Sequence, residues 1–266
     1  DVDSSLLTTR YTEEAIRVIR ERRRQPFFLY VAYSMPHVPI GTSAAFAGKS
    51  AGGRYGDVIE ELDWNIGRIV DTLRELRLED RTLIIFTSDN GPWTNMPSRM
   101  LVNDRVRLTD AGSAGPLRGS KGTTWEGGVR VPFIARWRGR IEPGVVSADI
   151  ASTLDILPTV AGLAGITLPP ALKLDGVDIM PLLDGEGPSP RQEIFFFNEG
   201  RLEAVRDGQW KLKVEWKKGF STPVPELFDL ENDPSERYNV AGANPETAER
   251  LLKRAMGFAK EVGAVR

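Results

Sequence analysis

The stretch RTLIIFTSDNGP, residues 81–92, decides the fold that we expect for this chain. Its apolar part, residues 83–86, is a short continuous run with two isoleucines, which is typical of a strand buried on both faces of a parallel sheet. The polar end, SDNGP, cannot continue a strand and concentrates oxygen ligands where the strand stops. Because ligands of open α/β sheets bind just beyond the carboxyl ends of strands, this end predicts a binding site.

Asp89 and Asn90 at this strand end have two interpretations. A carboxylate followed by an amide oxygen suits a hard cation such as Ca²⁺ or Mg²⁺, because such ions bind oxygen ligands. Asp, Asn and Gly are also the usual residues of tight turns, so an Asx turn that closes the strand explains the same residues without a metal. Taken alone, the stretch favours the plain turn.

The composition of the 266 residues excludes several classes of protein. A hydrophobic content of 41% and a charged content of 27% are those of an ordinary globular protein. The net charge of -2 gives no reason to expect nucleic acid or an anionic membrane as a partner. No cysteine is present, which rules out disulfides, thiolate zinc sites and a cysteine nucleophile within these residues. No apolar run is long enough to span a bilayer.

Three segments predict the strands of one parallel sheet, and helical segments separate them. FFLYVAY at residues 27–33 and an apolar run at residues 133–137 join the strand at residues 83–87. A helix capped by Thr12 precedes the first strand, and an amphipathic helix with apolar residues at helical spacing through residues 59–76 precedes the second. The alternation predicts an α/β fold with right-handed crossovers.

Three strands are few for such a sheet, and they would leave wide apolar edges open. We therefore expect a sheet that is incomplete on its N-terminal side. The chain also starts on Asp1 without a methionine, as a fragment or a processed product would. The open edge would offer a surface for a homo-oligomer or for another polypeptide.

The chain after residue 92 predicts a lid, a broken helix and a smaller subdomain. Residues 93–118 have no periodicity, and loops of this length are often functional lids. Residues 148–165 are apolar at helical spacing, with Pro158 predicting a kink or a break. After a Pro/Gly-rich linker come four strand candidates and a helix, at residues 193–198, 202–206, 210–216, 227–230 and 245–262. We expect residues 1–187 to form the α/β domain, and residues 188–266 a C-terminal subdomain with an antiparallel sheet.

Four blocks in fixed order resemble the type I sulfatases. They are His37 after FFLYVAY, YGDVIEELDWNIGRIVDTL (55–73), TLIIFTSDNGP (82–92) and GPLRGSKGTTWEGGVRVP (115–132). The segments AVRDGQWKLK (204–213) and ELFDLENDPSERYNV (226–240) are similar to the C-terminal signature of that family. Within it, the chain looks most like the branch of arylsulfatase A and N-acetylgalactosamine-6-sulfatase.

The resemblance implies an alkaline-phosphatase-like α/β fold, a bound Ca²⁺ and hydrolysis of aryl or carbohydrate sulfate monoesters. Asp89 and Asn90 match two metal ligands of the family, and Lys121 matches a lysine that binds a sulfate oxygen. His37 matches a histidine that contacts the sulfate and helps the leaving group. These roles agree with the chemistry, because a cation and a fixed ammonium stabilise charge on the sulfuryl oxygens, and an imidazole can share a proton with the departing oxygen.

Other polar and aromatic residues of these blocks have structural interpretations. We interpret Glu126 and Arg130 as an ion pair that supports the loop around Lys121. Trp93 and Trp125 either line the substrate pocket or serve in packing.

The chain also departs from the family in a part that matters for catalysis. The nucleophile of the family is a formylglycine made from the first residue of C/S-x-P-x-R, and no such motif occurs in these residues. Two upstream aspartates of the metal site, and a second lysine and histidine around the nucleophile, have no match either. We therefore expect half of a metal site, half of a sulfate pocket and no nucleophile.

Two alternatives to a sulfatase stay open at this point. One is a phosphate or phosphonate monoesterase of the same superfamily, against which the block around Lys121 argues. The other is a non-catalytic fragment that pairs with another polypeptide. The expected ligand is a sulfate-ester small molecule or saccharide. The compartment is not fixed by the sequence, although members of the family are commonly periplasmic, secreted or lysosomal.

Overall fold

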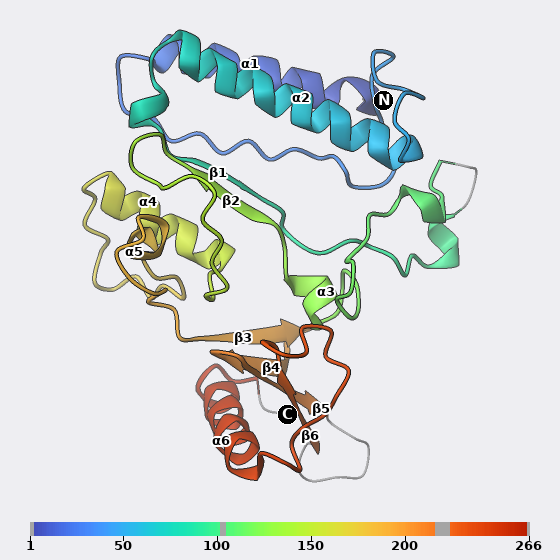
Figure 1. Cartoon of the computed structure of the whole chain (residues 1–266), viewed down its shortest axis with the longest axis vertical. Coiled ribbons are helices and arrows are strands. Elements are labelled where there is room, and N and C mark those ends of the chain that lie inside the picture. Colours follow the sequence, from blue (N-terminus) through green and yellow to red (C-terminus); the bar gives the residue numbers. More distant parts are fainter. Residues whose placement is uncertain (1–2, 102–104, 216–223, 265–266) are drawn as a thin grey trace. The chain divides into compact units, whose positions relative to one another are not determined.

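The computed structural model describes residues 3–101, 105–215 and 224–264, and Figure 1 labels its elements. Its helices are α1 (Leu7–Arg22), α2 (Gly53–Glu75), α3 (Glu126–Val129), α4 (Ile156–Leu163), α5 (Met180–Leu183) and α6 (Pro245–Glu261). Its strands are β1 (Ile84–Thr87), β2 (Phe133–Arg136), β3 (Glu193–Asn198), β4 (Arg201–Asp207), β5 (Trp210–Glu215) and β6 (Val224–Asp229). Within these described ranges, no helix combines the length and the apolar character that crossing a membrane requires.

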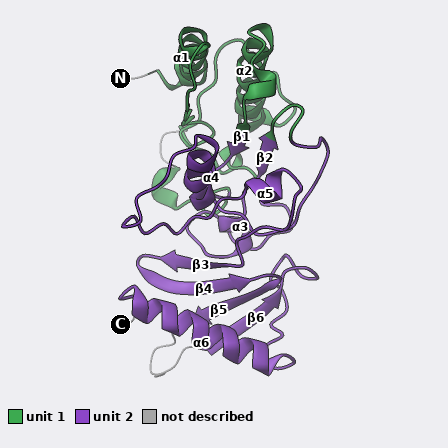
Figure 2. Ribbon diagram, turned by 90° about the vertical axis from the view of Figure 1, so that its left-hand side faces the viewer, with its two compact units in different colours: residues 1–84, 92–113, 136–140 green, residues 85–91, 114–135, 141–266 purple. Residues whose placement is uncertain are grey.

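Contacts between residues group the chain into two compact units, which Figure 2 colours separately. The first unit comprises residues 1–84, 92–113 and 136–140. The second comprises residues 85–91, 114–135 and 141–266.

Helices α1 and α2 of the first unit lie side by side (Figure 1). Ile19 of α1 and Leu73 of α2 are almost fully buried together with Leu78, and Phe27 and Leu29 pack against them. The apolar stripe of each amphipathic helix is thus buried against the other helix and the segment that follows α1.

The start of α1 differs from the prediction. The helix begins at Leu7, after a 3₁₀ turn whose N-cap, Asp3, accepts a hydrogen bond from the Ser5 N–H. Thr12 is an interior residue: its buried hydroxyl donates to the Thr8 carbonyl one turn back, at 2.9 Å. A threonine can bond the backbone in either setting, so its residue type alone does not distinguish a cap from a buried helical position.

Residues 27–33 do not form the predicted strand. They carry no ladder of hydrogen bonds within the described residues, although exposure alternates along them as it does in an extended chain. Phe28 and Tyr30 are 67% and 80% exposed, whereas Phe27 and Leu29 pack inward. A strand needs side chains that favour an extended backbone, and it also needs a neighbouring strand that bonds its backbone groups. The sequence of this segment shows the side chains but not the neighbour.

Acidic side chains of α2 organise the loop that follows His37. Asp57 accepts hydrogen bonds from the backbone N–H groups of residues 48–50, at 2.8, 3.0 and 2.8 Å. These bonds lower the pKa of the Asp57 carboxyl, because they favour its charged form. Glu61, one turn further along α2, accepts a hydrogen bond from the Ser43 N–H at 2.9 Å. The predicted helix therefore also fixes the loop before it.

The segment predicted as a lid packs within the first unit up to residue 113. Its described residues include two 3₁₀ turns, Ser98–Met100 and Leu108–Asp110. Met96 and Val106 are buried in one cluster with Val38, one residue beyond His37. This part of the segment is thus anchored to the loop that carries the histidine.

Strands β1 and β2 pair in a two-stranded sheet, which confirms strands at two of the three predicted positions. The helix predicted at residues 148–165 is shorter than expected. A 3₁₀ turn, Thr153–Asp155, precedes α4, so Pro158 falls in the first turn of the α-helix. Proline is tolerated there, because the first N–H groups of a helix have no intrahelical partner.

The C-terminal part of the second unit is a four-stranded antiparallel sheet in the order β3-β4-β5-β6. Helix α6 covers one face of it (Figure 1), where Leu251 and Ala255 are fully buried against Val205, Leu212 and Leu227. The predicted antiparallel sheet and terminal helix are confirmed; residue 216 of the third predicted strand lies outside the described residues.

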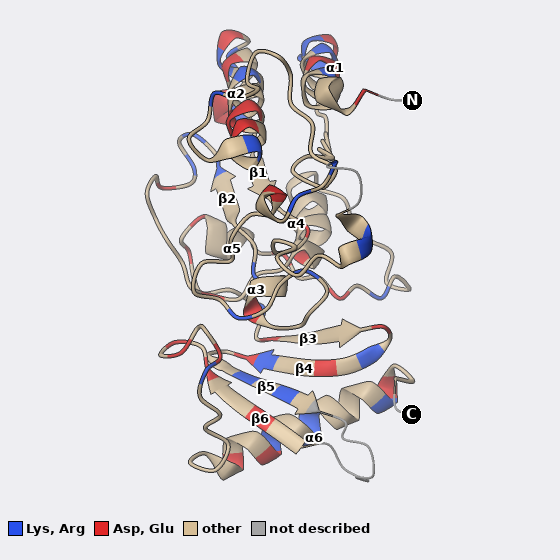
Figure 3. Cartoon of the chain, turned by 90° about the vertical axis from the view of Figure 1, so that its right-hand side faces the viewer, with Lys and Arg blue, Asp and Glu red and all other residues tan. Residues whose placement is uncertain are grey.

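Alternation along β5 places its two lysines on the face away from α6. Leu212 and Val214 point into the apolar core, so Lys211 and Lys213 belong to the opposite face. Figure 3 shows basic positions on β5, acidic positions on β6, and both kinds on β4.

A β-bulge changes the direction of one side chain on that face. The register of β3 and β4 shifts between Phe196 and Phe197, and Glu203 is left without a partner residue. An extra residue in one strand re-aims a side chain. The Glu203 carboxylate accepts a hydrogen bond from the Thr124 hydroxyl at 2.8 Å, which links the sheet to the glycine-rich block.

Candidate functional site

The turn after β1 carries both predicted metal ligands. The Ser88 hydroxyl donates to the Asn90 carbonyl at 3.0 Å, and the Asn90 side-chain N–H donates to the Gly91 carbonyl at 2.9 Å. With its nitrogen engaged, Asn90 keeps its amide oxygen as an acceptor. Asp89 is exposed, and its carboxylate forms no hydrogen bond or ion pair with any described residue.

A carboxylate and an amide oxygen of this kind fit a hard cation such as Ca²⁺. They are a partial ligand set, because hard cations bind six or more oxygens. Among residues 3–101, 105–215 and 224–264, no group of three or more His, Cys, Asp or Glu residues is placed to hold a metal.

Lys121 lies in a tight turn of the glycine-rich block, residues 115–132. The Thr123 N–H donates to the Ser120 carbonyl at 3.1 Å, and the Thr123 hydroxyl donates to the same carbonyl at 2.8 Å. Gly122 has a φ of +87°, in the region that a type II turn requires at its third position. The turn therefore fixes the backbone at Lys121, whose side chain is half-buried.

The strand-end turn and the glycine-rich block are joined through their glycines. The Gly91 N–H donates to the Gly128 carbonyl at 3.0 Å. A Cβ on Gly91 would lie 1.9 Å from the Gly127 carbonyl oxygen, so only glycine permits this approach. The two predicted metal ligands and Lys121 thus belong to one connected piece of the second unit.

Replacement of Gly91 by alanine is expected to lower the free energy of unfolding by about 1–3 kcal/mol, because the new methyl group must push the two segments apart. Thermal or urea unfolding measures the change. Gly257→Ala is the matched control, since Gly257 lies inside α6 and its ideal Cβ has no atom within 4 Å apart from its chain neighbours and the backbone of the helix itself. That substitution is expected to stabilise the helix by roughly 0.5–1 kcal/mol. Equal effects of the two would contradict the tight contact.

Trp125 is a packing residue of the block. The Arg118 guanidinium lies 3.7 Å and the Lys213 ammonium 4.1 Å from the centroid of its ring, and Phe228 meets it edge-on at 5.7 Å. Burial lowers the pKa of Lys213, in the direction expected for an ammonium taken out of water. Trp93 likewise packs against the apolar cluster of the first unit.

Glu126 has a closer partner than the predicted Arg130. Arg130 lies 4.0 Å from its carboxylate, whereas the Lys211 ammonium lies at 2.8 Å. Glu236 joins them, 2.9 Å from the same ammonium. Burial raises the pKa of the Glu236 carboxyl, against the attraction of the Lys211 charge.

Sequence reasoning missed Lys211 and Glu236 as buried partners of Glu126. Both lie in the quoted C-terminal segments, Lys211 within KLK and Glu236 within SER. The only local signal was a lysine on the polar side of an alternating strand, which also describes an ordinary solvated residue.

His37 lies in the first unit, between two proline residues that each follow a cis peptide bond. Its Nδ1 is 2.7 Å from the Val38 carbonyl oxygen. A carbonyl only accepts hydrogen bonds, so Nδ1 carries a proton, and in the neutral form of the ring Nε2 is the acceptor. The side chain is exposed, and its Nε2 can share a proton with a ligand.

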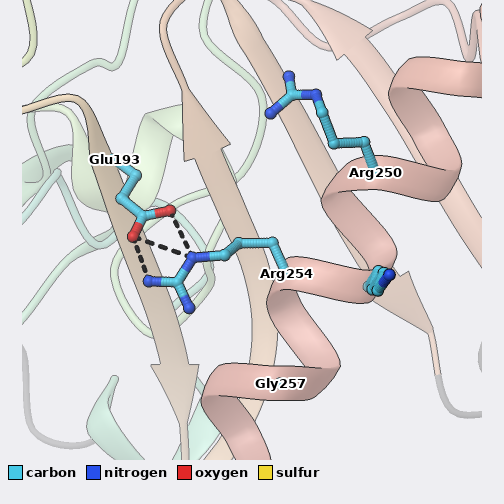
Figure 4. A pocket seen from close by; sticks show the side chains of 5 residues that line it. Glu193, Arg250, Arg254 and Gly257 are labelled. Carbon is cyan, nitrogen blue, oxygen red and sulfur yellow. Dashed lines mark hydrogen bonds and ion pairs between the residues drawn. The ribbon is translucent and has the colours of Figure 1, made fainter.

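Two surface hollows of the second unit lie elsewhere. One, of 420 Å³, is lined by Glu193 and four residues of α6, and Figure 4 shows Arg254 paired with Glu193 there. The other, of 670 Å³, is lined in part by Leu154, Phe197 and Phe258. Neither hollow includes a predicted site residue.

Comparison with known proteins identifies the family. Residues 4–166 match the sulfatase family, and residues 120–257 match the family described as N-sulphoglucosamine sulphohydrolase, C-terminal. Arylsulfatase A of Homo sapiens is 40% identical over 92% of this chain and 51% of its own length. Steryl-sulfatase of Homo sapiens is 37% identical over 93% of this chain and 46% of its own length.

Solved structures agree with these relatives. A sulfatase from a Pseudoalteromonas species superposes with a TM-score of 0.82 and 27% identity, over 98% of this chain and 55% of that chain. A Bacteroides thetaiotaomicron protein from work on glycosaminoglycan metabolism superposes with a TM-score of 0.81 and 32% identity, over 96% of this chain and 55% of that chain.

The chain therefore belongs to the sulfatase family. Its fold is the predicted alkaline-phosphatase-like α/β fold with a C-terminal antiparallel sheet. The chain spans about half the length of the curated relatives it matches.

Proposed function

We propose that this chain is part of a calcium-dependent hydrolase of sulfate monoesters. The observation that carries the proposal is the bond between Gly91 and Gly128, which joins the turn of Asp89 and Asn90 to the block that holds Lys121. A cation-binding turn next to a fixed ammonium suits an anion whose peripheral oxygens gain charge during transfer.

Each predicted residue has a role that its surroundings permit. The unengaged oxygens of Asp89 and Asn90 would hold Ca²⁺, which supplies electrostatic stabilisation of the sulfuryl oxygens when bound. Lys121 would bind a sulfate oxygen near the ester bridge. His37, with its proton on Nδ1, would use Nε2 to exchange a proton with the leaving group.

The proposed reaction needs groups that the 266 residues do not contain. The formylglycine motif and two further aspartate ligands have no match in this sequence. They would have to come from polypeptide outside it, either continuous with the chain or separate. Outward-facing apolar residues on the β1–β2 sheet, Phe86 at 38% and Ile134 at 59% exposure, offer a packing surface for such a segment. We place the boundary of the C-terminal subdomain after residue 187.

The substrate class that we propose is an aryl or saccharide sulfate. Human arylsulfatase A at 40% identity supports an aryl leaving group. A structural neighbour at 27% identity was solved in complex with a neocarrahexaose, which supports a saccharide.

The purified 266-residue chain is expected to show no appreciable hydrolysis of nitrophenyl sulfate with Ca²⁺ present, because it lacks the nucleophile. The same assay on the chain combined with the polypeptide that carries C/S-x-P-x-R is expected to show turnover that a calcium chelator removes. Robust Ca²⁺-dependent turnover by the isolated chain would overturn the requirement. A reading frame with no such motif upstream, and a stable oligomer in solution, would favour a non-catalytic module.

A phosphonate or phosphate monoesterase is the second candidate. A phosphonate monoester hydrolase from Silicibacter pomeroyi has a TM-score of 0.69 at 21% identity, which is a likeness of fold. Parallel assays with nitrophenyl sulfate and a phenylphosphonate ester discriminate between the two activities.

A further inference from the structure

Three charged side chains of the second unit meet in an enclosed cluster next to the glycine-rich block. The Lys211 ammonium lies 2.8 Å from Glu126 and 2.9 Å from Glu236, and all three residues are at most 1% exposed. Arg206 and Arg130 are farther from the Glu126 carboxylate, at 3.9 and 4.0 Å. One ammonium therefore faces two carboxylates away from water.

Stability alone does not explain this cluster. The cost of removing buried ions from water offsets most of their attraction. Apolar residues of similar volume in the same place would give equal or greater stability. Glu236 adds a backbone cost, since its φ of +53° lies in the left-handed region that residues with a Cβ rarely adopt. Because this buried cluster contributes little to stability and includes a strained residue, we look for its role in positioning a neighbouring segment.

The segment that this cluster holds in place is the loop around Lys121. The Glu236 carboxylate accepts a hydrogen bond from the Glu126 N–H at 2.7 Å. The Glu236 backbone carbonyl accepts one from the Arg118 guanidinium at 3.0 Å. Glu236 thus anchors the chain on both sides of Lys121, while Lys211 fixes the two carboxylates.

We propose that Glu236 and Lys211 are positioning residues for Lys121, so that the C-terminal sheet sets the place of the ammonium that meets a sulfuryl oxyanion. The inference rests on the proposed function, because it takes Lys121 as the anion-binding group. Glu236 and Lys211 do not touch the anion; they act through the backbone of the loop. A displacement of about 1 Å can cost roughly 10²-fold in rate, so such anchoring matters.

Competitive labelling of lysine amines in the full 266-residue chain tests this proposal. Trace acetic anhydride and mass spectrometry give the labelling rate of Lys121 relative to Lys253, an exposed lysine of α6. Inorganic sulfate is then titrated to find the concentration that protects Lys121 by half. Glu236→Leu removes the side-chain acceptor for the Glu126 N–H, whereas Glu236→Gln keeps an acceptor oxygen there.

We expect Glu236→Leu to change the relative labelling rate of Lys121 and to raise the half-protecting sulfate concentration roughly tenfold, as loss of a supporting partner does elsewhere. Glu236→Gln is expected to stay within about twofold of the unaltered chain on both readouts. If Glu236→Leu does not fold, Arg118→Met removes the other anchor from the exposed side of the block and is expected to act in the same direction.

Leu251→Ala controls for a general loss of stability. Leu251 is buried between α6 and the sheet, so the substitution weakens the same sheet without removing an anchor of the loop. The proposal is overturned if Leu251→Ala shifts Lys121 as Glu236→Leu does, or if Glu236→Leu and Arg118→Met leave both readouts unchanged. Failure of sulfate to protect Lys121 in the unaltered chain counts against the proposed function instead, and the relative labelling rate still decides the positioning role.

Discussion

Replacement of Lys211 by methionine is expected to lower the free energy of unfolding by about 3–5 kcal/mol. Lys211 is fully buried, and its ammonium compensates both Glu126 and Glu236. Removal of one partner of a buried ion pair leaves the other charge buried and uncompensated, and here two carboxylates remain. Methionine keeps most of the side-chain volume of lysine, so the decrease in the free energy of unfolding measures the loss of the charge and not a loss of packing. Urea unfolding followed by tryptophan fluorescence measures it.

Two further variants test whether the loss comes from the buried, uncompensated carboxylates and not from removal of a lysine charge as such. Lys253→Met, on the exposed face of α6, is expected to change stability by less than about 0.5 kcal/mol. The triple variant Lys211→Met/Glu126→Gln/Glu236→Gln is expected to regain most of the stability, because all three fully buried charges of the cluster are removed. A loss below about 1 kcal/mol for Lys211→Met would show that water or another cation reaches the carboxylates.

Replacement of Lys121 by methionine is expected to lower kcat for an aryl sulfate by about 10²–10³-fold, in a preparation that contains this chain and hydrolyses the ester. The backbone at Lys121 is held by a turn with Gly122 in the left-handed region, and on our proposal this turn places the ammonium before the reaction begins. A fixed charge of this kind acts most strongly on the transition state, where the sulfuryl oxygens gain charge.

The kinetic pattern distinguishes this role from simple attraction of the substrate. Loss of a transition-state contact lowers kcat and kcat/KM together, whereas loss of uniform binding raises KM with kcat unchanged. Lys253→Met serves as the matched control, since it removes the same charge from an exposed position on α6. A rate for Lys121→Met within about threefold of the unaltered protein would exclude the proposed role.

The C-terminal sheet is the part of the fold that local sequence signals predict best. The turn at Asp207 and Gly208 and the alternation along residues 210–215 mark a hairpin whose two strands pair as expected. Residues 27–33 have equally strong side-chain signals and form no strand, because hydrogen bonding to a neighbour is a property of the assembled sheet. The prediction of Thr12 as a cap is wrong, because a threonine hydroxyl can bond the backbone in a helix interior as well as at a helix start.

In the candidate site, too, residues in local motifs could be predicted from the sequence, and partners that are distant in the sequence could not. Asp89, Asn90 and Lys121 lie in compact motifs, so a few residues sufficed to propose them. The partner of Glu126 is Lys211, 85 positions later, and no local pattern pairs residues at that distance. Arg130 lies in the same motif as Glu126, but its guanidinium is 4.0 Å from the carboxylate. An ion pair between distant residues depends on which strand packs against which loop, and a prediction of the fold class does not specify this.

The anchoring of the Lys121 loop by Glu236 has a consequence for biosynthesis. Glu126 and Glu236 are 110 residues apart, and chains are made at about 5–20 residues per second, so the loop leaves the ribosome seconds before its anchor exists. Its final geometry therefore forms after translation has passed the last strand of the sheet. A nascent chain that stops before Glu236 would contain His37, Asp89, Asn90 and Lys121 and still lack the contacts that hold the Lys121 loop in place.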